Sequence, residues 1–458
     1  MHFTTPLDAP LAKKSLKQRL LGAARWTLVG HFLSQVLRFV SNLILTRLLA
    51  PDLFGVMSVG YTVFTALWMV SDLGFGAVVA RSHRGDQPVF LNVVWTMQIA
   101  RGVLISLGAL ALSGALWIGA GATLFPAHSV YADPRLVTLI AVLSLYGLLS
   151  GLESTKSLWV RRNLALARLT KIELICQAMM TAFILVWAWF DPSIWALGVG
   201  WLFGVTLRTL LSHAALPGPR NRIEWEKKAF DEIIDFGKWA LVSSPISFLI
   251  GSGDRLLLGA LLDATHMGFY ATAALFTTAL QAVVLKIVGQ SVLPALSEIV
   301  RTRPDELLST IYRVRLPLDA FCFALAGLLL VIGQPLVHFL YDPRYTPAGW
   351  MLSVISITLM FTPLNVLDQC LIALGRIRLL SILNAARVVV LYSLVPLGYH
   401  FFGIEGAVAA VPLAAFINAI TSLAVQGRLG LLNLKRELLA VPFLTSGLLI
   451  GALFRMLL

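Results

Sequence analysis

Charged residues are scarce in this sequence: only 13% of its 458 residues are Asp, Glu, Lys or Arg, while 58% are hydrophobic. A soluble domain carries about a quarter charged residues, so most of this surface must face something other than water. Cysteine is also scarce. The three cysteines, Cys176, Cys322 and Cys370, all fall in apolar stretches, so we infer no disulfide and no metal site.

What the sequence does have is a series of apolar stretches of about 20 residues, each long enough to cross a bilayer as a helix. Such runs are too long and too continuous for the alternating strands of about 10 residues in a membrane barrel. The sequence therefore predicts an all-α integral membrane protein. The expected spans are 23–47, 54–79, 89–118, 135–154, 166–190, 192–213, 236–260, 265–289, 315–341, 346–373, 377–400, 403–426 and 437–457.

The net charge of +13 is distributed unevenly about these spans. Alternate loops hold 26 Lys and Arg residues, whereas the opposite side holds five: Arg47, Arg135, Arg255, Arg344 and Arg455. The positive-inside rule puts the rich loops and the N-terminus in the cytoplasm, with the chain in a bacterial inner membrane. Topology and anionic membrane lipids explain the basic loops, so we expect no nucleic-acid partner.

The loops leave little room for catalysis. The longest outward loop, 119–134, has little polar chemistry, and no P-loop, metal-ligand cluster or nucleophile–base pair occurs on the cytoplasmic side. Residues 1–22 are basic and amphipathic, but no signal-peptide cleavage pattern follows them. We therefore expect a transporter, with no enzyme activity and no cofactor, although coupling to H⁺ or Na⁺ stays open.

A polar linker at 214–235 divides the chain near its midpoint. LLAPDLFGVMSVG around Gly55 resembles LLDATHMGFYATA around Gly268, and both lie between the first and second span of their half. Two six-helix halves would be related by a pseudo-two-fold axis along the membrane normal. The expected organisation is a cytoplasmic segment 1–22, a six-helix bundle 23–213, the linker 214–235, a second six-helix bundle 236–426, and about one extra C-terminal helix in 427–458.

Charges inside the spans need a reason, because each costs at least about 2.5–3.5 kcal/mol at the bilayer centre. Arg38 lies in mid-span and shares one helix face with His31, Gln35 and Asn42, a stripe typical of the wall of a wet cavity. The alternative is a polar contact that only holds helices together.

Further cations lie at depth. Arg101 follows Trp95 and Gln98 at three-residue steps, and Arg387 follows Asn384 in the second half. We expect Trp95, Gln98 and Asn384 to line the same cavity as polar residues. Because arginine stays charged and binds phosphate bidentately, these residues predict a substrate with phosphate or another strong anion. Two cations nearer the span ends, which either join this site or snorkel to the interface, are Arg255 and Lys286.

Four acids in the spans are candidates either for ion coupling or for pairing with these arginines: Asp72, Glu153, Glu173 and Asp368.

Several segments resemble the polysaccharide-flippase (Wzx-like) branch of the multidrug/oligosaccharidyl-lipid/polysaccharide exporter superfamily. They are LTRLLAPDLFGVMSVG (45–60), SDLGFGAVVARS (71–82), FLNVVWTMQIARG (90–102) and GDRLLLGALLDATHMGFYATAALF (253–276). The resemblance implies two six-helix bundles around a cationic cavity, with Arg101 and Arg255 as motif residues. It also implies export of undecaprenyl-pyrophosphate-linked oligosaccharide from the cytoplasmic to the periplasmic leaflet, for lipopolysaccharide or exopolysaccharide synthesis, with a polymerase and chain-length proteins as possible partners.

Three other readings compete. A drug or cation antiporter of the same superfamily is expected to have an acidic residue near the bilayer centre in the first span. This chain has Arg38 there instead. A MurJ-type lipid II flippase shares the pyrophosphate of the substrate. A glycan polymerase or ligase needs a sizeable outward loop, which this chain lacks.

Overall fold

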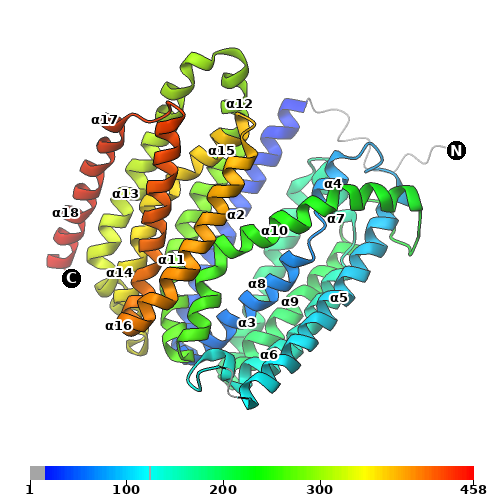
Figure 1. The fold of residues 1–458 in the computed structure, drawn as a ribbon. Helices are drawn as coiled ribbons and strands as arrows, with labels where there is room; N and C mark the ends of the chain where they lie inside the picture. The colour runs from blue at the N-terminus through cyan, green and yellow to red at the C-terminus, as the bar shows by residue number, and fades with distance from the viewer. Residues whose placement is uncertain (1–15, 123–124, 458) are drawn as a thin grey trace. The chain divides into compact units, whose positions relative to one another are not determined.

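The computed structural model describes residues 16–122 and 125–457, and all of its regular structure in these residues is helical (Figure 1). Residues 1–15 of the predicted cytoplasmic segment lie outside the described residues, whereas 16–22 form the start of the first helix. Among these described residues, eleven helices are long and apolar enough to cross a membrane. The predicted all-α integral membrane fold is confirmed.

The first compact unit comprises residues up to 49, 60–124 and 132–245. Its helices are α2 (Leu16–Leu48), most of α3 (Pro51–Val70), α4 (Phe75–Arg81), α5 (Pro88–Gly121), α6 (Pro134–Gly151), α7 (Lys156–Arg162), α8 (Leu166–Phe190), α9 (Ile194–Ala214) and the first part of α10 (Lys227–Leu261).

The second unit comprises residues 50–59, 125–131 and 246–458. Its further elements are η1 (Val130–Ala132), α11 (Ala264–Ile287), the π-helical η2 (Val288–Val292), α12 (Leu293–Thr302), η3 (Pro304–Glu306), α13 (Leu307–Leu340), η4 (Pro343–Tyr345), α14 (Ala348–Ser356), η5 (Ile357–Leu364), α15 (Asn365–Ala373), α16 (Ile377–Arg428), α17 (Leu434–Glu437), η6 (Leu438–Ala440) and α18 (Val441–Leu457).

The predicted spans agree closely with these helices, and α8 covers the predicted 166–190. Continuous α16 contains two predicted spans, which part at Gly403, where φ is 62° and ψ is −145°. Only glycine adopts that conformation at low cost. α2, which contains the predicted span 23–47, is not among these eleven helices. Counting α2 as well, and α16 as two, gives thirteen long helices among the described residues.

The predicted span 54–79 is wrong at its end. α3 stops at Val70, and α4 begins as a separate short helix after a turn at 71–74. Gly74 has a φ of 61°, and its amide donates to Asp72 Oδ1 at 3.0 Å. A left-handed glycine with a local carboxylate acceptor ends the helix. The turn places Ser71 and Asp72 where a neighbouring helix can reach them.

Small residues let the helices pack closely. A Cβ on Gly102 of α5 would lie 2.7 Å from the carbonyl oxygen of Gly147 on α6. In the second unit, a Cβ on Gly447 of α18 would lie 2.1 Å from the carbonyl oxygen of Ala324 on α13. Glycine at helix interfaces is the usual means of close approach in membranes, where apolar burial alone gives no driving force.

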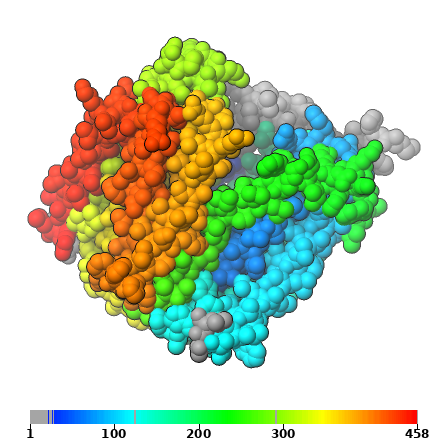
Figure 2. Space-filling model, in the orientation of Figure 1, coloured from blue at the N-terminus to red at the C-terminus, as the bar shows by residue number. Residues whose placement is uncertain are grey.

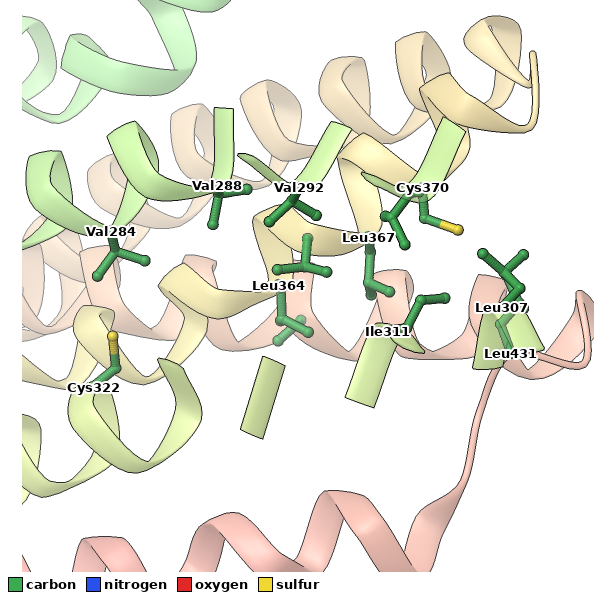
Figure 3. Packing of buried hydrophobic residues seen from close by; sticks show 13 residues of the cluster. Val284, Val288, Val292, Leu307, Ile311, Cys322, Leu364, Leu367, Cys370 and Leu431 are labelled. Atoms are coloured by element: carbon green, nitrogen blue, oxygen red, sulfur yellow. The ribbon is translucent and has the colours of Figure 1, made fainter. Parts of the chain in front are cut away.

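One apolar cluster of the second unit lies where α11, η2 and α12 meet α13 and α15. Figure 3 shows Val288, Val292, Leu364, Leu367 and Ile311 pointing toward one another in this cluster. The surface is apolar as well: on α18, at the edge of the view in Figure 2, Leu449, Leu453 and Phe454 are exposed. In water such exposure would be unstable, so this surface suits the hydrocarbon of a bilayer.

Candidate functional site

The polar face of α2 carries Arg38, a cation without an ion-pair partner among the described residues. His31, Gln35 and Asn42 are partly buried, whereas Arg38 is exposed. Within 16–122 and 125–457, the Arg38 guanidinium makes no hydrogen bond and no ion pair. A guanidinium presents five donors in a rigid fork and keeps its charge. Arg38 therefore has its full donor set available to an anionic ligand.

Arg101 is in a different environment, because it is held by the end of α3. Its side chain is buried, with Nη2 2.7 Å from the carbonyl oxygen of Trp68 and Nε 3.2 Å from Ser71 Oγ. Its Nη1 lies 3.8 Å from Asp72 Oδ1, and the guanidinium lies 4.5 Å from the Trp68 ring centre. These contacts use the Nε donor and one Nη2 donor, and they join α5 to the end of α3 and the turn after it.

Trp95 and Gln98, predicted to line a cavity beside Arg101, instead contact the end of α6. The Trp95 indole donates to the Leu152 carbonyl at 3.4 Å. The Gln98 amide donates to the carbonyls of Ser150 and Glu153 at 3.3 and 3.1 Å. The last carbonyls of a helix have no partner inside the helix, so these side chains satisfy groups that would otherwise be left unpaired in the membrane.

The three candidate acids of the first unit each lie near an arginine. Glu153 Oε2 is 3.3 Å from Arg208 Nε, and Glu173 Oε1 is 2.8 Å from Arg161 Nη2. Asp72 has its own arginine at the turn described above. Among the described residues, no group of three or more His, Cys, Asp or Glu side chains is arranged to hold a metal ion. Asp72, Glu153 and Glu173 are therefore arranged as partners of arginines.

The second unit contains a cavity of about 310 Å³. It is enclosed by α10, α11, the broken segment α14–η5–α15, and both parts of α16. The break in the middle of this wall, at η5, contains Pro363, and 3₁₀ geometry within a long helix often marks a functional site. The polar residues that line the cavity are Asp254, Tyr270, Thr277, Thr278, Gln281, Thr358, Thr362, Asn365, Arg387, Asn418 and Ser422.

Arg387 lines this cavity, but its guanidinium forms an ion pair with Asp368. Nη1 lies 2.7 Å from Asp368 Oδ2 and Nη2 2.9 Å from Asp368 Oδ1, a bidentate ion pair. Asn384 Oδ1 and Ser422 Oγ accept the remaining contacts at 3.1 and 3.3 Å. The two charged side chains are only 17% and 13% exposed. The pair fastens α15 to α16, and its positive charge is neutralised locally.

The two remaining predicted cations differ from each other. Arg255 on α10 is partly buried and makes no hydrogen bond or ion pair with the described residues, although it follows Asp254 directly. Asp254 accepts a hydrogen bond from Tyr270, a fully buried tyrosine on α11. Lys286 is partly buried near the end of α11 and interacts with another part of the chain.

The cavity residues that sequence reasoning missed as site candidates include Tyr270, Gln281, Asn365 and Asn418. A signal for three of these four was present. Tyr270, Thr277 and Gln281 follow one another at steps of seven and four along α11, which places them on one helix face. Asn418 and Ser422 on α16 show the same four-residue step. Asn365 carries no such signal, because its position depends on the local break before α15.

A family model and a curated relative both match this chain, and both are described as proteins of polysaccharide or lipopolysaccharide biosynthesis. Residues 44–349 match the model of the polysaccharide biosynthesis protein family. The chain is 20% identical over 418 residues to the lipopolysaccharide biosynthesis protein WzxC of Escherichia coli (strain K12), covering 89% of this chain and 81% of that protein.

Two solved structures share the fold. The lipid II flippase MurJ in an inward closed conformation superposes with a TM-score of 0.70, at 12% identity, over 95% of this chain and 92% of that one. An inward-facing multidrug resistance MATE transporter of the MOP superfamily gives 0.68, at 13% identity, over 87% and 94%. At these identities the similarity concerns the fold alone.

Proposed function

This chain is a multi-pass membrane protein that belongs to the polysaccharide biosynthesis protein family, and from this we propose that it is a flippase for lipid-linked oligosaccharides. The proposed substrate is an undecaprenyl-pyrophosphate-linked repeat unit, carried from the cytoplasmic to the periplasmic leaflet of a bacterial inner membrane. The N-terminus lies on the cytoplasmic side in this proposal. The expected downstream partners are the polymerase and chain-length proteins that use the exported unit.

The single observation that best supports this substrate is the state of Arg38. It is a full positive charge on a membrane helix, and none of the described residues neutralises it. Such a charge is costly unless something else uses it. A pyrophosphate provides oxygens in the bidentate geometry that a guanidinium prefers. Arg255, which also lacks an acid partner among the described residues, is a second candidate.

The roles of the cations therefore divide. Arg101 and Arg387 were predicted to bind pyrophosphate, but their donors are used by the fold, and we assign them to helix fastening. Arg38 and Arg255 keep free donors and are assigned to the pyrophosphate. The four acids Asp72, Glu153, Glu173 and Asp368 are assigned to ion pairs, and H⁺ or Na⁺ coupling has no support from their geometry.

The mechanism follows from the cost of moving a charged head group. A pyrophosphate with a glycan cannot enter hydrocarbon bare, so protein donors must replace its hydration shell while the lipid tail stays in the membrane. The protein then exposes this site to one leaflet and afterwards to the other. Net transport in one direction then follows the difference in chemical potential of the substrate between the leaflets, which use of the exported unit by downstream enzymes would maintain. No bond is made or broken.

The test is deletion of the gene, with complementation by wild-type or Arg38→Gln protein at matched membrane abundance. We expect the deletion strain to stop making surface or secreted polysaccharide and to accumulate lipid-linked repeat units. Normal polymer together with altered drug tolerance would support an antiporter instead. A defect confined to lipid II and cell-wall synthesis would support the MurJ-type reading.

A further inference from the structure

Four side chains that line the cavity of the second unit keep an oxygen without a hydrogen-bond partner among the described residues. Asn418 Oδ1 is buried and has no hydrogen-bond partner in the described residues. Asp254, Gln281 and Asn365 each use one side-chain atom for a contact within the protein and keep an oxygen free. A buried acceptor without a partner is costly, so Asn418 Oδ1 favours a ligand that donates a hydrogen bond, and the free oxygens of Asp254, Gln281 and Asn365 can accept further ones.

The charges of the residues that line the cavity also favour a neutral ligand that donates hydrogen bonds over an anion. Its one lining guanidinium, that of Arg387, is neutralised by Asp368, whereas the Asp254 carboxylate contacts a neutral phenol. A phosphate carries acceptor oxygens and negative charge, so here it would meet unfilled acceptors and a carboxylate. Like charges and unmatched acceptors oppose binding. The cavity is therefore poorly suited to a pyrophosphate.

We propose that this cavity binds a sugar unit of the substrate, and that the pyrophosphate is held elsewhere. Sugar hydroxyls and acetamido N–H groups donate hydrogen bonds, which matches the free oxygens of Asp254, Gln281, Asn365 and Asn418. Phe361 in the wall offers an apolar surface for the C–H face of a sugar ring. This inference rests on the proposed function, and it names the part of the substrate that this cavity recognises.

The volume sets the size of the ligand. About 310 Å³ is at the lower end of the range of about 300–1,000 Å³ for small-molecule sites. The cavity therefore suits a single sugar unit with its substituents, and a whole oligosaccharide would extend beyond it. Recognition of one unit would allow the rest of the glycan to vary without loss of binding.

The test is chemical protection of a cysteine placed in the cavity wall of the full-length protein. Ala415→Cys on α16 lines the cavity, and the native cysteines at 176, 322 and 370 are buried and give a low background. The rate of labelling by a small maleimide is measured in lipid nanodiscs with N-acetylglucosamine, galactose or glucosamine, and with inorganic pyrophosphate. We expect at least one saccharide to slow labelling and pyrophosphate to leave it unchanged.

Two variants on the same helix give a matched comparison. Asn418→Leu keeps the branching of the side chain and removes the free acceptor in the cavity. Gln426→Met removes a buried amide that also lacks a hydrogen-bond partner in the described residues but does not line the cavity. Asn418→Leu should weaken saccharide protection by about tenfold, as the loss of one good hydrogen bond predicts, whereas Gln426→Met should not change it.

Protection by pyrophosphate, or protection by none of the three saccharides, would overturn the sugar-site assignment. Equal loss in the two variants would do the same, because it would reduce the effect to general destabilisation. These outcomes are separate from the deletion phenotype. A strain that still loses its polymer on deletion, with no saccharide protection in vitro, refutes the sugar site and leaves the flippase proposal standing.

Discussion

Replacing Arg387 with Gln should destabilise the protein, whereas the same change at Arg38 should impair export and leave the fold intact. The Arg387–Asp368 pair is bidentate, at 2.7 and 2.9 Å, and both side chains are mostly buried. Arg387→Gln leaves a buried carboxylate without its cation, a change that costs about 3–5 kcal/mol. Arg38 is exposed and unpaired in the described residues, so its loss should not lower the stability of the fold.

The assay is chemical unfolding in mixed lipid–detergent micelles, with membrane abundance and polymer export measured in parallel. The double variant Arg387→Gln/Asp368→Asn is the control, because it removes both charges and should recover most of the lost stability. At Arg38, a Lys variant should retain part of the export, since it keeps the charge and loses the bidentate fork. The reasoning is refuted if Arg387→Gln is as stable as wild type, or if Arg38→Gln loses stability in step with export.

Three further changes test other parts of the structure. Gly55→Leu should prevent correct folding and lower membrane abundance, because even a Cβ there would lie 1.8 Å from the carbonyl oxygen of Ala264. Glu437→Gln should destabilise by roughly 1–3 kcal/mol in the same unfolding assay, since it weakens two charge-assisted bonds of 2.7 Å from buried Arg315. Glu224→Ala removes the 2.8 Å bond from Asn92 Nδ2, so it should loosen the linker and speed its cleavage by added trypsin, with little effect on the unfolding of the helical core.

The spans could be predicted from the sequence because apolar length and flanking charge decide them locally. The bounds of α8 and the division of α16 at Gly403 follow from such signals. The break after α3 was missed because the run 54–79 is apolar throughout, and the turn depends on one glycine and one carboxylate contact.

Which deep arginine is free could not be predicted from the sequence. Arg38, Arg101 and Arg387 each follow an amide or other polar residue by one helix turn, and their local sequences do not separate them. The partners of Arg101 and Arg387 lie 30 and 19 residues away, on other helices, and only the packing brings them together. The family motifs were the better guide to the proposed function. The motif at 90–102 indicates the family, whereas the position of Arg101 in the sequence does not show that its side chain contacts the end of α3.

The most direct test of the central claim is a leaflet assay for lipid-linked repeat units. Spheroplasts from deletion and complemented strains are treated with an impermeant glycosidase specific for the repeat unit, and the cleaved fraction of the lipid-linked pool is measured. We predict that the wild-type gene makes a large share of this pool accessible, and that the deletion and Arg38→Gln strains keep it protected until the membrane is opened. Equal accessibility with and without the protein would contradict the account.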